Sequence, residues 1–159
     1  MSTDQLLIRD ACAEDLEGLV MFEIEIARIS FPDSPLDDPA FHVRRINAAL
    51  EDEREGTFVA VGGGLPLVVG WAWISIRTNF LTKDRYGFLR SLAVAASARG
   101  SAVADALLER SIAFAENDGS EEVIGKVHVN NLAMRVAYAS AGFDPTHLTM
   151  RLRPARRQD

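Results

Sequence analysis

A turn of small residues at positions 98–101, with the letters ARGS, is the first feature of the sequence that could bind a ligand. The residues before it, 86–94 (YGFLRSLAV), are apolar and aromatic enough for a buried strand. After it, apolar residues return at helical spacing. A strand that enters a helix through such a turn directs free backbone N–H groups at one point, and the helix dipole adds positive charge there. The turn therefore predicts a phosphate site, although many similar turns in α/β proteins bind nothing.

The chain as a whole is acidic and ordinary in composition. Its 159 residues suit one domain, 48% of them are hydrophobic, and the formal net charge is −6. This charge argues against a nucleic-acid partner, which requires neutralisation of phosphates, and is compatible with a cationic small substrate. The one cysteine, Cys12, cannot form an internal disulfide, and the sequence shows neither a signal-peptide pattern nor an apolar run long enough to span a membrane. We therefore expect a cytoplasmic protein with no membrane partner.

The hydrophobic periodicity predicts a mixed α/β fold in one domain, residues 1–159. Strands are expected at residues 5–9, 57–61, 67–77, 86–94, 122–129 and 147–153, and helices at 14–29, 37–50, from 101 to about 119, and 132–141. The run from 86 to 129 is short, which makes its two strands parallel neighbours. Alternation on the strand at 67–77 places Trp71 and Trp73 on one face and Ala72 and Ile74 on the other. Residues 154–159 should form a frayed tail.

A second motif follows this parallel unit. The string NLAMRVAYASAGF at 131–143 places Asn131 after a strand, Tyr138 one helix later, and Gly142-Phe143 at the end of that helix. Together with the turn at 99–104, this pattern resembles the GNAT superfamily of acyl-CoA-dependent N-acetyltransferases over nearly the whole chain. The resemblance implies a GNAT-like acyl-CoA N-acyltransferase fold, in which the strands at 86–94 and 122–129 are parallel and splayed.

The resemblance also implies acetyl-CoA (coenzyme A) as cosubstrate. We expect no metal, because three scattered histidines and one cysteine do not make a metal site. The pyrophosphate of acetyl-CoA would lie against the turn and the first helical residues, Arg99, Gly100, Ser101, Ala102, Val103 and Ala104. Its pantetheine arm would bond to the backbone of Leu92, Ala93 and Val94. Asn131 would contact the cofactor, cap the following helix, or do both. Ala102 stands where the family usually has glycine, and it suits the site only if its dihedral angles are helical.

The implied reaction is direct transfer of the acetyl group to a primary amine on a small molecule or peptide. No enzyme nucleophile is needed, and Tyr138 would serve the leaving thiolate as donor, unless its ring only packs against the sheet. Glu23 and Trp73 would border the acceptor, or belong to the surface and the core. Arg90 and Ser91 replace a strand glutamate of many relatives, which keeps open a second interpretation, a catalytically silent acyl-CoA-binding sensor or interaction domain. A third, another nucleotide-binding domain, lacks the glycine and lysine motifs.

The end of the chain predicts self-association. Relatives close this end of the sheet with a hairpin of two strands, but after Phe143 the sequence predicts a single strand, at 147–153. A single strand leaves an unpaired sheet edge, which proteins seldom leave bare. We therefore expect the edge to be paired across a homodimer.

Overall fold

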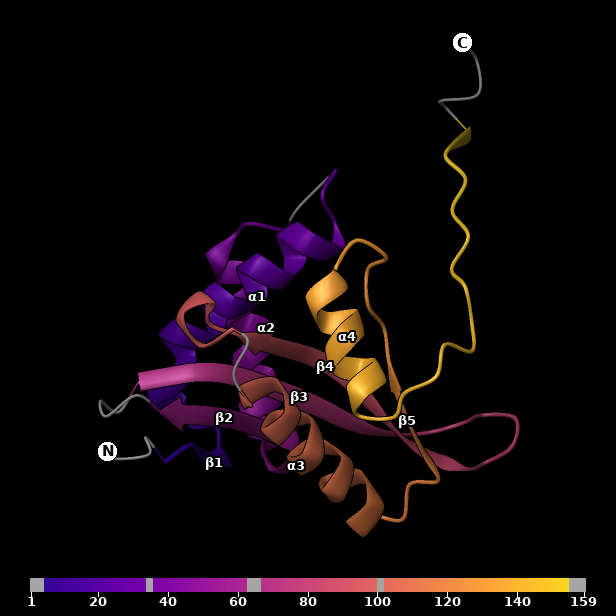
Figure 1. The fold of residues 1–159 in the computed structure, drawn as a ribbon, viewed down its shortest axis with the longest axis horizontal. Coiled ribbons are helices and arrows are strands. Elements are labelled where there is room, and N and C mark those ends of the chain that lie inside the picture. The colour runs from indigo at the N-terminus through magenta and orange to yellow at the C-terminus, as the bar shows by residue number, and fades with distance from the viewer. Residues whose placement is uncertain (1–4, 34–35, 63–66, 100–101, 155–159) are drawn as a thin grey trace.

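The computed structural model describes residues 5–33, 36–62, 67–99 and 102–154, and it arranges them around a five-stranded sheet (Figure 1). The strands are β1 (Leu7–Asp10), β2 (Thr57–Gly62), β3 (Leu67–Thr78), β4 (Arg85–Val94) and β5 (Glu122–Gly125). The helices are α1 (Leu16–Ser30), α2 (Pro39–Asp52), α3 (Val103–Asn117) and α4 (Leu132–Ser140). The predicted order of strands and helices is confirmed from β1 to α4. None of the described helices has the length and apolar character needed to cross a bilayer.

Neighbouring strands of the sheet follow the order of the chain. β1 to β4 are antiparallel, and α3 carries the chain over to β5, which pairs with β4 in parallel as predicted. The β4–β5 pairing is short, because it begins at Tyr86 opposite Glu122 and ends at Leu89 opposite Gly125. β4 continues to Val94, so its last residues pair with β3 but not with β5.

Different helices cover the two faces of the sheet. Trp71 and Trp73 belong to a buried cluster with apolar residues of α1 and α2, whereas Ala72 and Ile74 belong to one with α3 and α4. The predicted alternation along β3 is therefore confirmed. α3 approaches β3 so closely that a Cβ on Gly70 would lie 2.8 Å from a methyl group of Val103. A glycine at this position is what allows the helix to pack against the strand.

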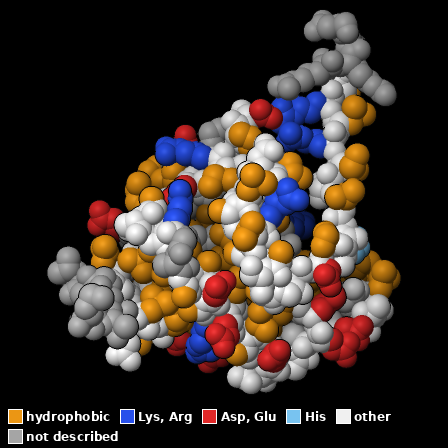
Figure 2. Space-filling model, in the orientation of Figure 1, with side chains coloured by type: hydrophobic (Ala, Val, Ile, Leu, Met, Phe, Trp, Pro, Cys, Tyr) orange, Lys and Arg blue, Asp and Glu red, His pale blue; other side chains and the backbone are white. Residues whose placement is uncertain are grey.

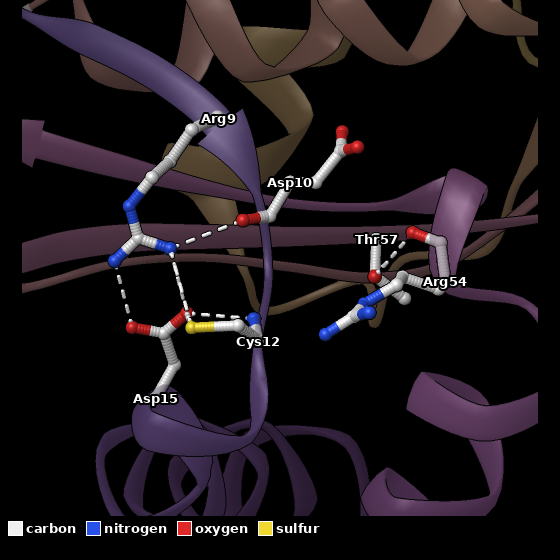
Figure 3. A network of polar contacts seen from close by, with 6 residues as sticks. All are labelled: Arg9, Asp10, Cys12, Asp15, Arg54 and Thr57. Carbon is white, nitrogen blue, oxygen red and sulfur yellow. Dashed lines mark hydrogen bonds and ion pairs between the residues drawn. The ribbon is translucent and has the colours of Figure 1, made fainter.

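A charged pair fixes the connection from β1 to α1. Arg9 donates hydrogen bonds to both carboxylate oxygens of Asp15, at 2.8 and 2.9 Å, and the backbone N–H of Cys12 donates to the same carboxylate at 2.9 Å (Figure 3). The hydrogen bond from Arg9 lowers the pKa of Asp15, although burial acts in the opposite direction. Such a two-pronged contact sets geometry as well as energy. Cys12 thus occupies a structural turn at the start of a helix.

Two predictions near the C-terminus are wrong. The strand expected at 122–129 ends at Gly125, because the chain there leaves β4 and rises toward the start of α4 (Figure 1). The strand expected at 147–153 is not formed, since residues 143–153 carry neither strand nor helix. An extended segment becomes a strand only when a neighbour completes its backbone hydrogen bonds. No described strand of this chain lies beside it.

The segment 144–153, which we call the C-terminal arm, stands apart from the body of the molecule (Figure 1). Its alternating apolar side chains, Leu148 and Met150, are 83% and 86% exposed. Near its end, Arg151 and Arg153 form ion pairs with Asp33, between α1 and α2. The arm therefore has the alternating pattern of a strand without a surface on which to bury its apolar side. The tail expected at 154–159 lies outside the described residues except for Pro154.

Candidate functional site

The point at which β4 and β5 separate is the centre of the candidate site. Trp73 and Ile74 are consecutive in β3, but they pair with Ser91 and Leu89 of β4, so Arg90 is an extra residue in β4, a β-bulge. Leu89 is also the last β4 residue that pairs with β5. The bulge therefore lies at the separation itself. Beyond it, no strand in the described part of the chain pairs with the last residues of β4 on the β5 side, and a ligand can bond to backbone groups there.

The start of α3 is the second component of the site. Ala102 precedes the helix with φ −76° and ψ 9°, so it is not left-handed and carries no backbone strain. Val103 and Ala104 follow in the first turn, where backbone N–H groups have no partner within the helix. The alanine that replaces the usual glycine is thus compatible with an anion at this helix end.

The preceding turn is described in part. Arg99 forms an ion pair with Glu25 of α1, so this predicted phosphate ligand already has an anionic partner in the chain. Gly100 and Ser101, the other predicted ligands in the turn, lie outside the described residues.

Tyr138 reaches the separation of β4 and β5 from α4. A Cβ on Gly125 would lie 2.7 Å from Tyr138 Oη and 2.8 Å from its Cζ, so the hydroxyl rests against the last residue of β5. The ring packs against Phe143, with centroids 4.9 Å apart, and 8% of the tyrosine is exposed. Burial raises the pKa of the Tyr138 hydroxyl to about 12. The side chain is therefore well packed and also protonated at neutral pH, as a hydrogen-bond donor must be.

Asn131 caps α4. Its Oδ1 accepts a hydrogen bond from the backbone N–H of Met134 at 3.2 Å. The structure thus shows one of the two roles that the sequence left open for this residue. The other, a contact with a ligand, is compatible with the cap because the side-chain amide N–H groups take no part in it.

Glu23 lies beneath the site and not on the surface. It is 2% exposed, and its two carboxylate oxygens accept hydrogen bonds from Trp71 Nε1 at 2.8 Å and from Arg45 Nη1 at 2.5 Å. A buried carboxylate is tolerated when it is bonded in this way. Arg45 was not predicted from the sequence, because no local pattern relates a residue of α2 to a glutamate 22 positions earlier.

Two guanidinium groups lie over Trp73. Arg45 Cζ lies 4.7 Å and Arg90 Cζ 4.3 Å from the centre of a Trp73 ring, both within the range of cation–π attraction. The guanidinium groups cover the tryptophan, which is 2% exposed. Burial lowers the pKa of Arg90, and the positive charges of Arg45 and Arg77 lower it further. Trp73 Nε1 and Ser91 Oγ are buried without a hydrogen-bond partner among the described residues.

The structure therefore places predicted residues on both faces of the sheet, near the separation of β4 and β5. Leu92 and Tyr138 belong to the cluster on the α3 side, whereas Trp73 and Ala93 belong to the cluster on the α1 and α2 side. The importance of Gly125 was not predicted. A glycine inside a strand often marks a close approach, and this is the signal that could have identified it.

The mixed sheet, with parallel strands that separate between the start of α3 and Tyr138, has the arrangement that the resemblance to acetyltransferases implies. Residues 21–143 match the Acetyltransferase (GNAT) family, and this range contains β4, the start of α3, β5 and Tyr138. The chain therefore belongs to the GNAT acetyltransferase family, which confirms the resemblance seen in the sequence. A comparison with curated proteins gave no match.

Solved acetyltransferases share the fold over nearly their whole length. Aminoglycoside N-acetyltransferase AAC(6')-Iy in complex with CoA has a TM-score of 0.75 at 21% identity, over 94% of this chain and 95% of that chain. The same enzyme with the bisubstrate analogue CoA-S-monomethyl-acetylneamine gives 0.72 at 20% identity, over 94% and 97%. An acetyltransferase from Trypanosoma brucei gives 0.66 at 22% identity, over 94% and 99%. At these identities the likeness establishes the fold, and the substrate must be argued from the site.

Proposed function

We propose that this protein is an N-acetyltransferase that moves an acetyl group from acetyl-CoA directly to a primary amine. The observation that carries the proposal is the position of Tyr138 Oη against Gly125, where β4 and β5 separate. A protonated hydroxyl at this point can donate a hydrogen bond to a leaving thiolate. Membership of the GNAT family supports the same class of reaction.

Three groups of residues are proposed to bind acetyl-CoA. The pyrophosphate would be held at the start of α3, by Gly100, Ser101, Ala102, Val103 and Ala104. The pantetheine arm would extend along the free side of β4, beside Leu92, Ala93 and Val94. Asn131 would add a contact from the start of α4. Arg99 would have to exchange its partner Glu25 for a phosphate, since the two are paired in this structure.

The proposed reaction needs only modest help from Tyr138. Acetyl-CoA supplies a thioester, whose carbonyl carbon the amine attacks while the bond to sulfur breaks. The pKa of Tyr138, about 12, lies above the ordinary thiol value of about 8.5. The hydroxyl therefore stabilises the departing thiolate by a hydrogen bond, and complete proton transfer to sulfur is not required.

Glu23 is proposed to position its neighbours. Both of its oxygens already accept hydrogen bonds within the chain, so they are poorly placed to remove a proton from the amine. Glu23 instead fixes Arg45 and Trp71 beneath the acceptor side of the site, and the amine proton passes to solvent. No residue of the site is needed as a covalent nucleophile.

Binding and turnover test the proposal separately. Calorimetry should show acetyl-CoA binding, and thiol release should follow the addition of a suitable amine. Ala102→Glu places a negative charge at the proposed phosphate site and should raise the acetyl-CoA Kd by about tenfold or more. Asn117→Glu adds the same charge at the other end of α3 and should leave it unchanged. Binding without thiol release from a broad amine panel would favour a silent acyl-CoA-binding domain, and absence of binding would refute both functions.

We further propose that the enzyme is a homodimer in which the C-terminal arm is covered. β5 is an edge strand whose outer side has no partner in the described chain, and the arm carries Leu148 and Met150 on one exposed side. Proteins seldom leave such an edge and such a surface open together. Light scattering should therefore give twice the mass of one chain. The double substitution of Leu148 and Met150 by glutamate should produce monomers, whereas Phe80→Glu, in an exposed loop, should not. A monomeric wild-type protein at tens of micromolar would refute the dimer.

A further inference from the structure

Four basic side chains gather over two aromatic rings on the α1 and α2 side of the sheet. Arg45 and Arg90 lie over Trp73, while Arg77 Cζ lies 4.5 Å and Lys126 Nζ 5.9 Å from the ring centre of Phe88. Arg90 is the bulge residue of β4, and Lys126 follows the last residue of β5. The cluster therefore borders the separation of β4 and β5 on both strands.

This basic cluster has few anionic partners. Arg45 is paired with Glu23, but Arg77, Arg90 and Lys126 take part in no ion pair among the described residues. The acidic groups whose charges act on Arg90 are Glu53 and the already bonded Glu23. Arginine keeps its positive charge at neutral pH. Three cations thus gather at the site without an ion-pair partner in the described part of a chain whose net charge is −6.

The charges on the face of the molecule drawn in Figure 2 are also unevenly spread. Figure 2 shows Lys and Arg side chains mainly over the upper part of the visible face, toward α1, α4 and the arm. Most Asp and Glu side chains on this face lie over its lower part, toward α3 and β5. An uneven distribution of this kind steers charged ligands toward the region of opposite sign.

The cluster lies on the opposite face of the sheet from the proposed phosphate site. A Cβ on Gly87 would lie 3.0 Å from Ala115 Cβ of α3, and Leu89 belongs to the α3 cluster, so Phe88 between them faces the other way. The pyrophosphate of acetyl-CoA would bind at the start of α3 itself. Arg90, by contrast, lies over Trp73 on the α1 and α2 side of the separation, where a molecule approaching from that side would contact it. The acceptor, and not the cofactor, is therefore the partner of this cluster.

We propose that the acceptor amine carries an anionic group, a carboxylate or a phosphate, which binds Arg90 together with Arg77 and Lys126 while the amino group faces the acetyl carbon. This inference rests on the proposed function and names its substrate class. The planar guanidinium group matches carboxylate and phosphate oxygens in pairs. An aminoglycoside or a polyamine carries several ammonium groups and would meet the same cluster with like charge, which disfavours binding.

Matched pairs of amines test this selectivity. Thiol release would be measured for amino acids against their amides, and for phosphoethanolamine against ethanolamine, with spermidine and an aminoglycoside as polycations. In the pair that is acetylated, the anionic amine should have a kcat/KM at least about tenfold higher than its neutral counterpart. A preference among the amino acids would indicate a carboxylate, and a preference for phosphoethanolamine would indicate a phosphate. Polycations preferred over both anionic classes would overturn the inference.

Two arginine variants supply the comparison within the protein. Arg90→Gln should reduce the ratio of kcat/KM between the anionic and the neutral amine of the productive pair to about twofold. It should leave the acetyl-CoA Kd within about tenfold of the wild-type value. Arg44→Gln removes the same charge from an exposed position of α2 that takes part in no described ion pair, and the ratio should stay unchanged. An unchanged ratio of kcat/KM in Arg90→Gln would overturn the proposal that Arg90 binds the anionic group of the acceptor.

A binding measurement keeps this inference separate from the proposed function. If acetyl-CoA binds and no amine releases thiol, the transfer reaction is refuted. The anionic amines should even then raise the Tm of the acetyl-CoA complex, and the rise should vanish in Arg90→Gln, because ligands stabilise the state that they bind. Equal Tm values with the anionic amines and their neutral counterparts would overturn the inference on its own.

Discussion

Replacement of Gly125 by alanine tests the site at its tightest contact. The new Cβ would lie 2.7 Å from Tyr138 Oη and 2.8 Å from Cζ, whereas ordinary contact begins at 3.4 Å. The hydroxyl or the strand must therefore move by roughly 1 Å, and the buried ring packed on Phe143 has little room to turn aside. A displacement of about 1 Å can cost about 10²-fold in rate, and overpacking costs about 1–3 kcal/mol. We expect Gly125→Ala to lower kcat and the free energy of unfolding by about these amounts.

Thiol release at saturating acetyl-CoA and urea unfolding measure the two effects. Gly18→Ala is the control, because a Cβ on Gly18 of α1 meets nothing within 4 Å. It should leave kcat unchanged and add about 0.5–1 kcal/mol of stability. In a Tyr138→Phe background, Gly125→Ala should lower kcat by less than about threefold more, since the two changes act on the same hydroxyl. Wild-type kcat and stability in Gly125→Ala would refute the placement of Tyr138 against β5.

Three further substitutions probe single residues. Tyr138→Phe should lower kcat by about 10–10³-fold and change the acetyl-CoA Kd by less than about tenfold, and an unchanged kcat would identify a packing residue. Asp15→Asn should lower the free energy of unfolding at neutral pH by about 1–3 kcal/mol. Because the folded-state pKa of Asp15 is depressed, this stability is present above about pH 4 and lost below it, so urea unfolding should show the two proteins converging as the pH falls. Glu23→Gln should cost about 1–3 kcal/mol in the same assay, since the Arg45 guanidinium loses its charged partner, and equal stability would argue against that pairing.

Periodicity and short motifs were sufficient to predict most of the fold. The alternation around Trp71 and Trp73 identified the two faces of β3, and the short strand–helix–strand run identified β4 and β5 as a parallel pair. These predictions succeeded because each depends on residues close together in the sequence. The strand at 147–153 failed for the opposite reason. Alternation describes one segment, whereas a strand also requires a neighbour to complete its hydrogen bonds.

The arrangement of the site depends on contacts between distant segments. Glu23 and Arg45 meet because α1 and α2 pack on the same face of the sheet, and Gly125 matters because α4 returns Tyr138 to the end of β5. The bulge at Arg90 depends on the register between β3 and β4. The register between two strands cannot be predicted from their residue types alone. The family motif indicated Tyr138 and the turn before α3, but it gave no sign of the basic cluster.

The two tryptophans give the protein a built-in optical reporter. They are the only tryptophans in the sequence, and their rings are 6.2 Å apart on β3. Trp71 donates a hydrogen bond to Glu23, and the guanidinium groups of Arg45 and Arg90 lie over Trp73. Tryptophan fluorescence therefore comes from this one place in the molecule, where two charged groups lie over an indole. A ligand that moves either arginine should alter the emission directly, so its binding can be followed in the unlabelled protein in real time.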